Sequence, residues 1–225
     1  MDYRRHIRVE SDAFLAAALD GSMDAPVTSC PGWTVSDLVG HLGVVQRFHG
    51  ANLARGITDP PTDQRPAPPE TGLADWFREG VDRLLARLDA AGTDTPAWNF
   101  LGAQPLTTAF WWRRMALEAQ IHRWDAELAR GRAGAFNPDL AADGVDEVVT
   151  VFLPDQRRAE DPEGTVHLLA ADGQRFRMIS GDGSAANATI SGTLDELLLV
   201  VWGRIPVVDL DVEGDMDLAA TCRWR

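Results

Sequence analysis

Apolar residues in the first half of the chain recur every three or four positions, which is the spacing of one buried helical face. Residues 3–19 show this spacing first. It predicts three further helices, over residues 35 to about 55, 71–91 and 106–129. Four amphipathic helices joined by loops predict a four-helix bundle.

Local signals mark where some of these helices begin and end. Thr34 and Asp37 have the spacing of a capping box, which predicts that the second helix starts at Val35. Residues 59–69 hold five prolines in eleven positions, which excludes regular structure and predicts a long loop before the third helix. Gly131 suits the C-terminal end of the fourth helix.

The second half of the chain changes character. Its pattern predicts a short helix, three strands, a helix and a last strand, over residues 144–152, 164–170, 174–180, 185–191, 194–202 and 207–212. Residues 171–173 (ADG) are a hairpin signal between the first two strands, and Thr193 suits the N-cap of the helix. We therefore expect an α+β protein, with a four-helix bundle over residues 1–140 and a small α+β domain over residues 141–225.

The net charge of the chain limits the classes of binding partner that we expect. The chain of 225 residues carries 21 arginines and no lysine against 34 acidic residues, which gives a net charge of −13. Neutralising phosphates requires clustered basic residues, so this balance argues against a general nucleic-acid binder. It also opposes adhesion to anionic membranes.

The N-terminal residues, the length of the apolar runs and the number of cysteines indicate the cellular compartment. Residues 1–10 are charged throughout, unlike a signal peptide, and the longest apolar run, residues 197–202, is far shorter than the ~20 residues that span a bilayer. Cys30 and Cys222 cannot form a disulfide scaffold and suit a reducing cytosol. We expect a cytoplasmic monomer or homodimer that binds a small molecule.

Three residues could carry chemistry. Glu118 and His122 stand four positions apart on one helix, so their side chains project from the same face. His41 lies in an apolar stripe of the second helix, where a buried ring needs a partner. If the two helices are neighbours, the three could form a two-His, one-carboxylate metal set with an open fourth position. Taken alone, however, such a Glu–His spacing is often just a solvated helix pair, and a lone histidine such as His41 is more often an ordinary core or surface residue than a ligand.

Two sequence blocks resemble a known family. Residues 30–42 (CPGWTVSDLVGHL) and 118–125 (EAQIHRWD) are similar to the two signatures of the mycothiol-dependent maleylpyruvate isomerases, a branch of the DinB-like metal-binding bundles. Residues 143–147 (DGVDE) and 197–204 (LLLVVWGR) resemble parts of that family's C-terminal domain. The resemblance spans nearly the whole chain in the same order.

The resemblance implies a function. It implies that His41, Glu118 and His122 bind one divalent metal, zinc, and that mycothiol is the thiol cosubstrate. A metal deprotonates a bound thiol, whose free pKa is about 8.5. The thiolate could add to an activated cis double bond and leave again, as in an isomerase, or stay attached to an electrophilic or carboxylate substrate, as in an S-transferase. The alternative is a non-catalytic metal-holding protein that binds a thiol conjugate or a small apolar ligand.

The sequence departs from the family pattern at Leu117, where many relatives carry a histidine before the metal-binding glutamate. Leu117 points about 100° away from Glu118, so it is not needed as a ligand. The resemblance also suggests that a C-terminal-domain arginine binds the substrate. Arg204 is the candidate catalytic residue, and an ordinary surface arginine is the alternative.

Neighbouring residues have simpler interpretations. His49 is expected at a solvated helix end, and Cys30 is expected to be buried. We expect Asp125 either to orient a metal ligand or to support Arg113 or Arg123. We expect Arg123 to pair with Asp125 or Glu127 on the helix surface.

Overall fold

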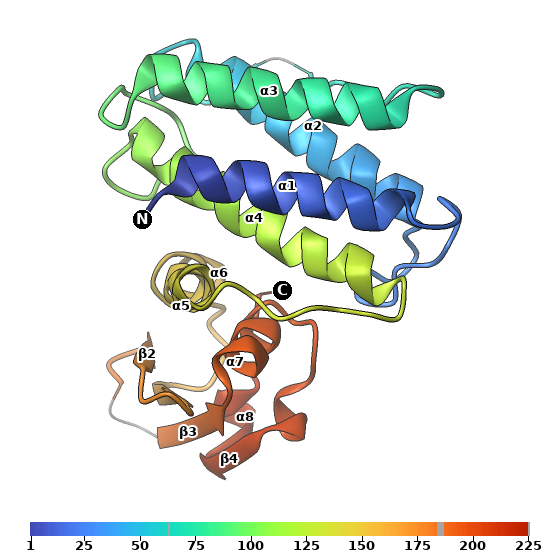
Figure 1. Ribbon diagram of the computed structural model, residues 1–225. Helices are drawn as coiled ribbons and strands as arrows, with labels where there is room; N and C mark the ends of the chain where they lie inside the picture. The colour runs from blue at the N-terminus through green and yellow to red at the C-terminus, as the bar shows by residue number, and fades with distance from the viewer. Residues whose placement is uncertain (63, 184–186, 225) are drawn as a thin grey trace. The chain divides into compact units, whose positions relative to one another are not determined.

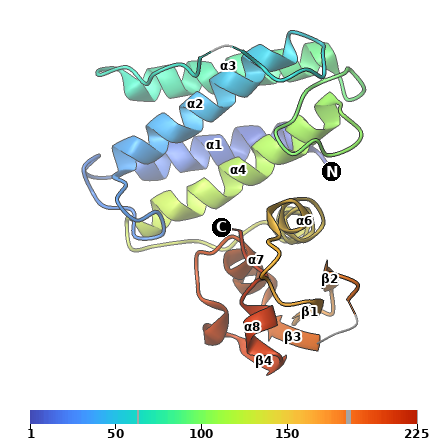
Figure 2. The ribbon, with the colours of Figure 1, turned by 180° about the vertical axis from the view of Figure 1, so that it is seen from behind.

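Four long helices form the first of two units in the computed structural model, which describes residues 1–62, 64–183 and 187–224. The helices are α1 (Tyr3–Leu19), α2 (Val35–Leu53), α3 (Leu73–Ala91) and α4 (Thr108–Leu128). α1 packs mainly along α4, and α2 mainly along α3 (Figures 1 and 2). The predicted four-helix bundle is confirmed, and this unit covers Met1–Gly134.

Apolar faces of the four helices meet in the interior of this unit. Phe14 of α1 and Phe77 of α3 are almost fully buried, and their ring centroids lie 5.2 Å apart. Leu42 of α2 and Trp111 of α4 fill the same interior at 0% and 1% exposure. Each such side chain stabilises the fold by about 1.5–3 kcal/mol relative to exposure, so the periodic apolar positions account for the bundle.

The capping box at the start of α2 is present as predicted. The Asp37 backbone N–H donates to Thr34 Oγ1 at 3.2 Å, and the Thr34 backbone N–H donates to Asp37 Oδ2 at 2.9 Å. Thr34 Oγ1 also donates to Asp37 Oδ2 at 2.7 Å, and the backbone and side-chain bonds that Thr34 donates lower the pKa of the Asp37 carboxyl. α3 begins two residues later than expected, after Gly72, whose φ of 70° belongs to the left-handed region.

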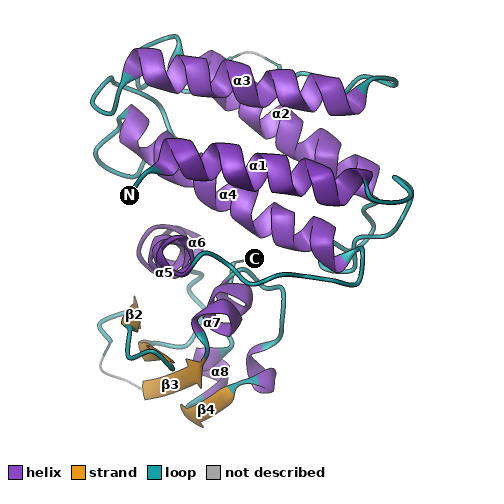
Figure 3. Cartoon of the chain, in the orientation of Figure 1, coloured by secondary structure: helices purple, strands orange, loops and turns teal. Residues whose placement is uncertain are grey.

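The second unit, Ala135–Arg225, combines helices with a four-stranded sheet (Figure 3). Its elements are α5 (Pro138–Glu147), the π-helical turn η1 (Val148–Phe152), α6 (Leu153–Gln156), β1 (Gly164–Ala170), β2 (Arg175–Ser180), β3 (Asn187–Gly192), α7 (Leu194–Val201), the 3₁₀ turn η2 (Val207–Asp209), β4 (Asp211–Gly214) and α8 (Met216–Ala219). The strand order is β2-β1-β3-β4, with β1 and β3 parallel and the outer pairs antiparallel. The predicted α+β class is confirmed.

Three expectations for this unit need correction. The helix predicted at residue 144 begins at Pro138, because the Asn137 side chain caps it and proline suits the first helical position. The last strand was expected over residues 207–212, but Val207–Asp209 forms a 3₁₀ turn after Pro206, and the strand starts only at Asp211. α8, four residues capped by Asp215, was not predicted.

Two further boundaries are the start of the second unit and the start of β3. The expected domain boundary after residue 140 falls inside α5, which belongs wholly to the second unit. The first two residues of the strand expected at 185–191 lie outside the described residues, and β3 follows them from Asn187. Within the described part of the chain, no helix combines the length and apolar character needed to cross a membrane.

Candidate metal centre

Three side chains from two neighbouring bundle helices converge on one point. His41 comes from α2, and Glu118 and His122 come from α4. The Nε2 atoms of His41 and His122 lie 3.4 and 3.3 Å from Glu118 Oε1. One ligand atom from each residue falls within 4.8 Å of the other two. The structure therefore brings together the three residues that the sequence indicated.

The cluster is open on one side. The side chain of His122 is 7% exposed and that of Glu118 15%, whereas His41 is 32% exposed. The ring of Trp33 lies 4.8 Å from the His41 ring, centroid to centroid, just before the start of α2. A small molecule would thus approach beside His41 and Trp33.

His122 is held from behind by a buried carboxylate. Its Nδ1 donates to Asp125 Oδ2 at 2.9 Å, and Asp125 is fully buried. Burial disfavours the charged imidazolium, but the carboxylates of Asp125 and Glu118 outweigh it and raise the pKa of His122 to about 9. The bond to Asp125 leaves Nε2 directed at Glu118, which is how a carboxylate orients a metal-binding imidazole.

Glu118 is oriented in the same way by a cation. Arg114, one turn earlier on α4 and 3% exposed, donates from Nη2 to Glu118 Oε2 at 2.8 Å. Burial alone would raise the pKa of Glu118, but Arg114 and then the two histidines hold it well below its usual value. The carboxylate stays ionised, with Oε2 held by Arg114 and Oε1 facing both imidazoles.

This donor set fits a divalent cation. Two imidazole nitrogens and one carboxylate oxygen are ligands that zinc accepts, and three protein ligands leave a coordination position open. Both partners that orient the ligands, Asp125 and Arg114, are already in place. The fit therefore rests on the orientation of His122 Nε2 and Glu118 Oε1 as well as on the short distances between the ligand atoms.

A second group shares His122. Cys30 Sγ lies 3.7 Å from Asp125 Oδ2, and the ligand atoms of Cys30, Asp125 and His122 are mutually within 4.8 Å. Because Asp125 Oδ2 already accepts the proton of His122 Nδ1, this group is better described as an orienting network. Cys30 is half-buried instead of fully buried as expected.

Two expectations about neighbouring residues were wrong. His49 is not solvated: it is 6% exposed and stacks on Trp111 at 3.9 Å, and burial together with Arg65 and Arg114 lowers its pKa to about 3 despite the opposing charge of Glu118. Arg123 pairs with Glu127, one of its two expected partners, but it does not lie on the surface.

Arg123 is 7% exposed. It donates from Nε to Glu10 of α1 at 2.6 Å and from Nη1 to Glu127 at 2.7 Å. Nothing in the local sequence pointed to Glu10, which is distant along the chain. Arg114 was also missed, although its position four residues before Glu118 was a usable signal. Of the two roles considered for Asp125, the structure shows the support of His122.

Two other sequence candidates lie outside this cluster. Leu117, where the sequence was expected to depart from the family pattern, is a core residue with 1% exposure. Arg204 follows α7 in the second unit, where Nη1 donates to the carbonyl of Trp202 at 3.0 Å. Its role toward a substrate stays a prediction.

Comparison with known proteins identifies the family. A sequence model of the mycothiol maleylpyruvate isomerase N-terminal domain matches residues 4–127, and a model of the MDMPI C-terminal domain matches residues 139–221. The chain belongs to the mycothiol maleylpyruvate isomerase family. It is thus a member of an enzyme family, as the two sequence blocks indicated.

Solved structures share the fold of this family member. The crystal structure of the mycothiol-dependent maleylpyruvate isomerase is 13% identical, with a TM-score of 0.66, and that of a mutant of the same name is 14% identical, with a TM-score of 0.69. Each alignment covers 96% of this chain and 92% of the solved chain. A comparison with curated proteins gave no match.

Proposed function

We propose that this family member is a divalent-metal-dependent enzyme that uses mycothiol to transform a small electrophilic molecule. His41, Glu118 and His122 would hold the metal, zinc in our proposal. The observation that carries the proposal is the orientation of the ligands: Asp125 directs His122 Nε2, and Arg114 directs Glu118 Oε1, toward one shared point.

The chemistry of a thiol explains why a metal is needed. A free thiol has a pKa of about 8.5 and is mostly protonated at neutral pH. When bound, a divalent cation would supply the positive charge that stabilises a thiolate at neutral pH.

The surrounding residues orient the proposed metal ligands and line the open side of the cluster. Asp125 keeps a proton on His122 Nδ1, so that Nε2 is the nitrogen whose proton a bound metal would displace. Arg114 keeps Glu118 ionised and restricts its rotation. Trp33 packs beside the more exposed His41 and gives the open side of the cluster an apolar surface against which a substrate can be oriented.

Two outcomes of thiolate addition define the reaction class. A thiolate that bonds to one alkene carbon turns the double bond into a single bond, rotation follows, and loss of the same thiolate restores the alkene in the other geometry. If the thiolate instead stays attached and the neighbouring carbon takes up a proton, the product is a thioether and the enzyme is an S-transferase. We propose an isomerase or an S-transferase that acts on an electrophilic carboxylate, with Arg204 binding the carboxylate through its planar fork.

The alternative is a metal-holding protein that binds a thiol conjugate without turnover. Membership of an enzyme family favours catalysis. The chain's two cysteines, Cys30 and Cys222, remain consistent with the predicted reducing, cytoplasmic setting.

Metal content tests the proposal directly. We expect about one zinc per purified wild-type chain by plasma mass spectrometry, and little in His122→Ala. The matched control is His167→Ala, which removes an exposed histidine of β1 in the second unit and should leave the metal content unchanged. A wild-type chain that holds no metal after zinc loading, or a His122→Ala chain that retains it, would refute the metal site.

Thiol dependence is tested on the metal-loaded protein. Electrophilic cis-alkene acids are incubated with and without mycothiol, and products are analysed by mass spectrometry. Isomerisation leaves the mass of the substrate and of the thiol unchanged, whereas S-transfer joins the two masses. Tight binding of a thiol conjugate without turnover of any substrate would favour the binding protein.

A further inference from the structure

A pocket lies in the first unit, between α2, α3 and the loop that follows α2. It has a volume of about 290 Å³. Its polar lining residues include Gln46, Arg47, Gln64, Arg83 and Arg87. Its described lining does not include His41, Glu118 or His122, so it is distinct from the metal centre. α2 and α3, which form its walls, run side by side in Figures 1 and 2.

Two glycines make room for the polar groups. A Cβ atom at Gly80 of α3 would lie 3.4 Å from Arg47 Nε and 3.7 Å from Gln46 Oε1. A Cβ atom at Gly50 of α2 would lie 3.7 Å from Arg87 Nη1. The guanidinium groups of Arg47 and Arg87 therefore lie over bare backbone.

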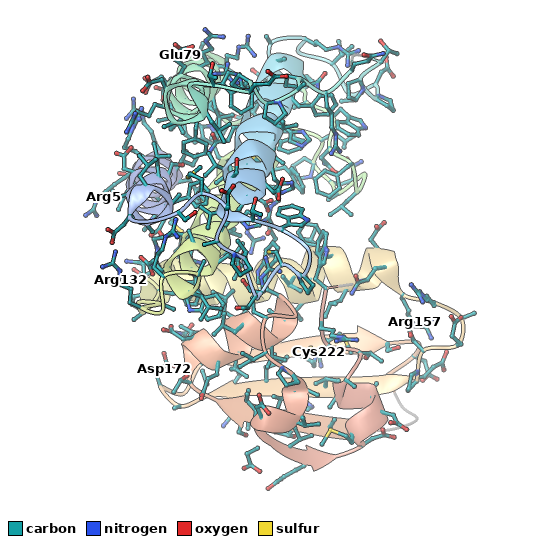
Figure 4. All side chains as sticks on the ribbon, turned by 90° about the vertical axis from the view of Figure 1, so that its right-hand side faces the viewer. Arg5, Glu79, Arg132, Arg157, Asp172 and Cys222 are labelled. Atoms are coloured by element: carbon teal, nitrogen blue, oxygen red, sulfur yellow. The ribbon has the colours of Figure 1, made fainter. Side chains whose placement is uncertain are left out.

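The pocket concentrates positive charge in an acidic protein. Three arginines line it, and the nearest acidic side chain recorded for them is Glu79, which is labelled on α3 in Figure 4. Glu79 Oε2 is 3.1 Å from Arg83 Nη2 and 3.9 Å from Arg47 Nη2. Within residues 1–62, 64–183 and 187–224, Arg87 has no ion-pair partner. Glu79 thus pairs with two of the three arginines, in a chain of net charge −13.

Two lining residues bury polar atoms that lack a partner among the described residues. Arg47 has a side-chain exposure of only 10%, and its Nε donates to nothing, although its Nη2 donates to the Trp76 carbonyl. Burial and the charge of Arg83 lower the pKa of Arg47, with partial opposition from Glu79. Gln46 is 1% exposed, and its Oε1 accepts nothing.

The available polar groups of the pocket indicate the chemistry of a ligand that could bind there. An unpaired buried donor or acceptor costs free energy that a bound molecule can restore. Arg47 and Arg87 offer N–H groups that match the oxygens of a carboxylate or a phosphate. The Gln46 carbonyl oxygen can only accept, so its partner must be an O–H or N–H donor.

We propose that this pocket binds a small hydroxylated anion, a molecule that carries a carboxylate or phosphate group together with a hydroxyl. The oxyanion contacts Arg47, Arg83 and Arg87, and the hydroxyl donates to Gln46 Oε1. The site is separate from the metal centre and independent of the reaction proposed for it.

Calorimetric titration of the metal-loaded protein at constant ionic strength tests the proposal. Malate and glycerol phosphate, which combine the two groups, represent the carboxylate and the phosphate source. We expect one saturable site for at least one of them. Arg87→Gln should weaken that binding by about tenfold or more, because charge-assisted hydrogen bonds are lost. The matched control is Arg78→Gln on α3, whose arginine pairs with Asp75 and does not line the pocket.

Three results would overturn the proposal. They are the absence of saturable binding of both probes, equal affinity in wild type and Arg87→Gln, and equal weakening by Arg78→Gln. Succinate, which lacks the hydroxyl, should bind more weakly than malate if malate is the better probe, and equal affinity would exclude the role of Gln46. Because metal content is verified for every variant, failure here leaves the metal centre unaffected.

Discussion

Four residues on one face of α4 act as a single unit around His122. Glu118 and His122 were visible in the sequence because their spacing is that of one helical turn. Arg114 precedes Glu118 by one turn, and Asp125 follows His122 by three residues, so each of the four reaches the next along the helix. The proposed metal-binding face is therefore largely encoded in one segment, and only His41 must come from elsewhere.

Neutralising the carboxylate behind His122 should weaken metal binding. In Asp125→Asn the amide oxygen can still accept from Nδ1, but the negative charge that makes the imidazole a better ligand is lost. We expect zinc affinity to fall by about 10–100-fold, the usual effect of changing such a partner. Competition with a chelating dye measures it. Asp75→Asn, an exposed change on α3, is the control, and equal affinities of the two variants would contradict this role for Asp125.

His49 predicts a specific dependence of stability on pH. Its pKa is about 3 in the folded protein and about 6.5 in the unfolded chain, so the unfolded chain binds more protons between these values. The stability that it contributes is fully present above pH 6.5 and is lost as the pH falls from 6.5 toward 3. The loss from this residue is up to about 1.4 kcal/mol per pH unit.

Urea denaturation of the metal-free protein at several pH values between about 4.5 and 7 measures this effect. We expect the free energy of unfolding of wild type to fall more steeply with acidification than that of His49→Phe, which keeps an aromatic ring against Trp111. Equal slopes would show that His49 has the same pKa in the folded and unfolded states, which would contradict its lowered pKa.

The four long helices of the bundle lie close to the residue ranges that the sequence pattern predicted. The distances between neighbouring helices could not be predicted from that pattern. Helical periodicity depends only on which residues share a face, and it located all four long helices. How near two helices approach depends on side chains from both. A Cβ atom at Gly43 of α2 would clash with Trp76 Cζ3 of α3, so the glycine is required by a residue that lies well beyond the proline-rich loop.

Replacing glycines of α2 should therefore give opposite results. Gly43→Ala forces the Trp76 ring aside and should destabilise the bundle by about 1–3 kcal/mol, despite the better helix propensity of alanine. Gly50→Ala meets its nearest atom, Leu84 Cδ1, at 3.5 Å and should be neutral or stabilising by up to about 1 kcal/mol. Urea denaturation of both variants measures the difference. A Gly43→Ala protein as stable as Gly50→Ala would exclude the proposed close packing.

Short elements of the second unit were harder to place. β4 is four residues long and exists through its antiparallel pairing with β3, which local sequence does not reveal. Val207 and Val208 have the composition of a strand, yet they follow Pro206 and form a 3₁₀ turn. The start of α5 at Pro138 had a clear signal in Asn137, but the apolar pattern drew the prediction to a later residue.

At the scale of the whole molecule, the two units correspond to two family domains. Residues 4–127 and 139–221 are matched by separate sequence models, and the chain divides between Gly134 and Ala135. The proposed metal ligands all lie in the first unit. Binding to folded protein alone stabilises that state by mass action, so a metal should act on the unfolding of the first unit.

Zinc should raise the thermal stability of this unit. At a free zinc concentration of about 100 times the dissociation constant, the stabilisation is about 2.7 kcal/mol. Differential scanning calorimetry with and without zinc measures the shift, and a chelator should reverse it. In His41→Ala the shift should be reduced or lost. The same zinc-induced shift in His41→Ala and wild type would show that zinc acts elsewhere.

The sequence by itself determined the four long helices, the α+β class, the family and the placement of Glu118 and His122 on one helical face. Each of these depends on the periodicity or order of residues close together in the chain. Only the tertiary structure decided that His41 meets Glu118, that Arg123 pairs with Glu10, that His49 is buried, and that three arginines gather beside two glycines. These contacts join distant segments, and they form only when the packing of whole helices brings those segments together.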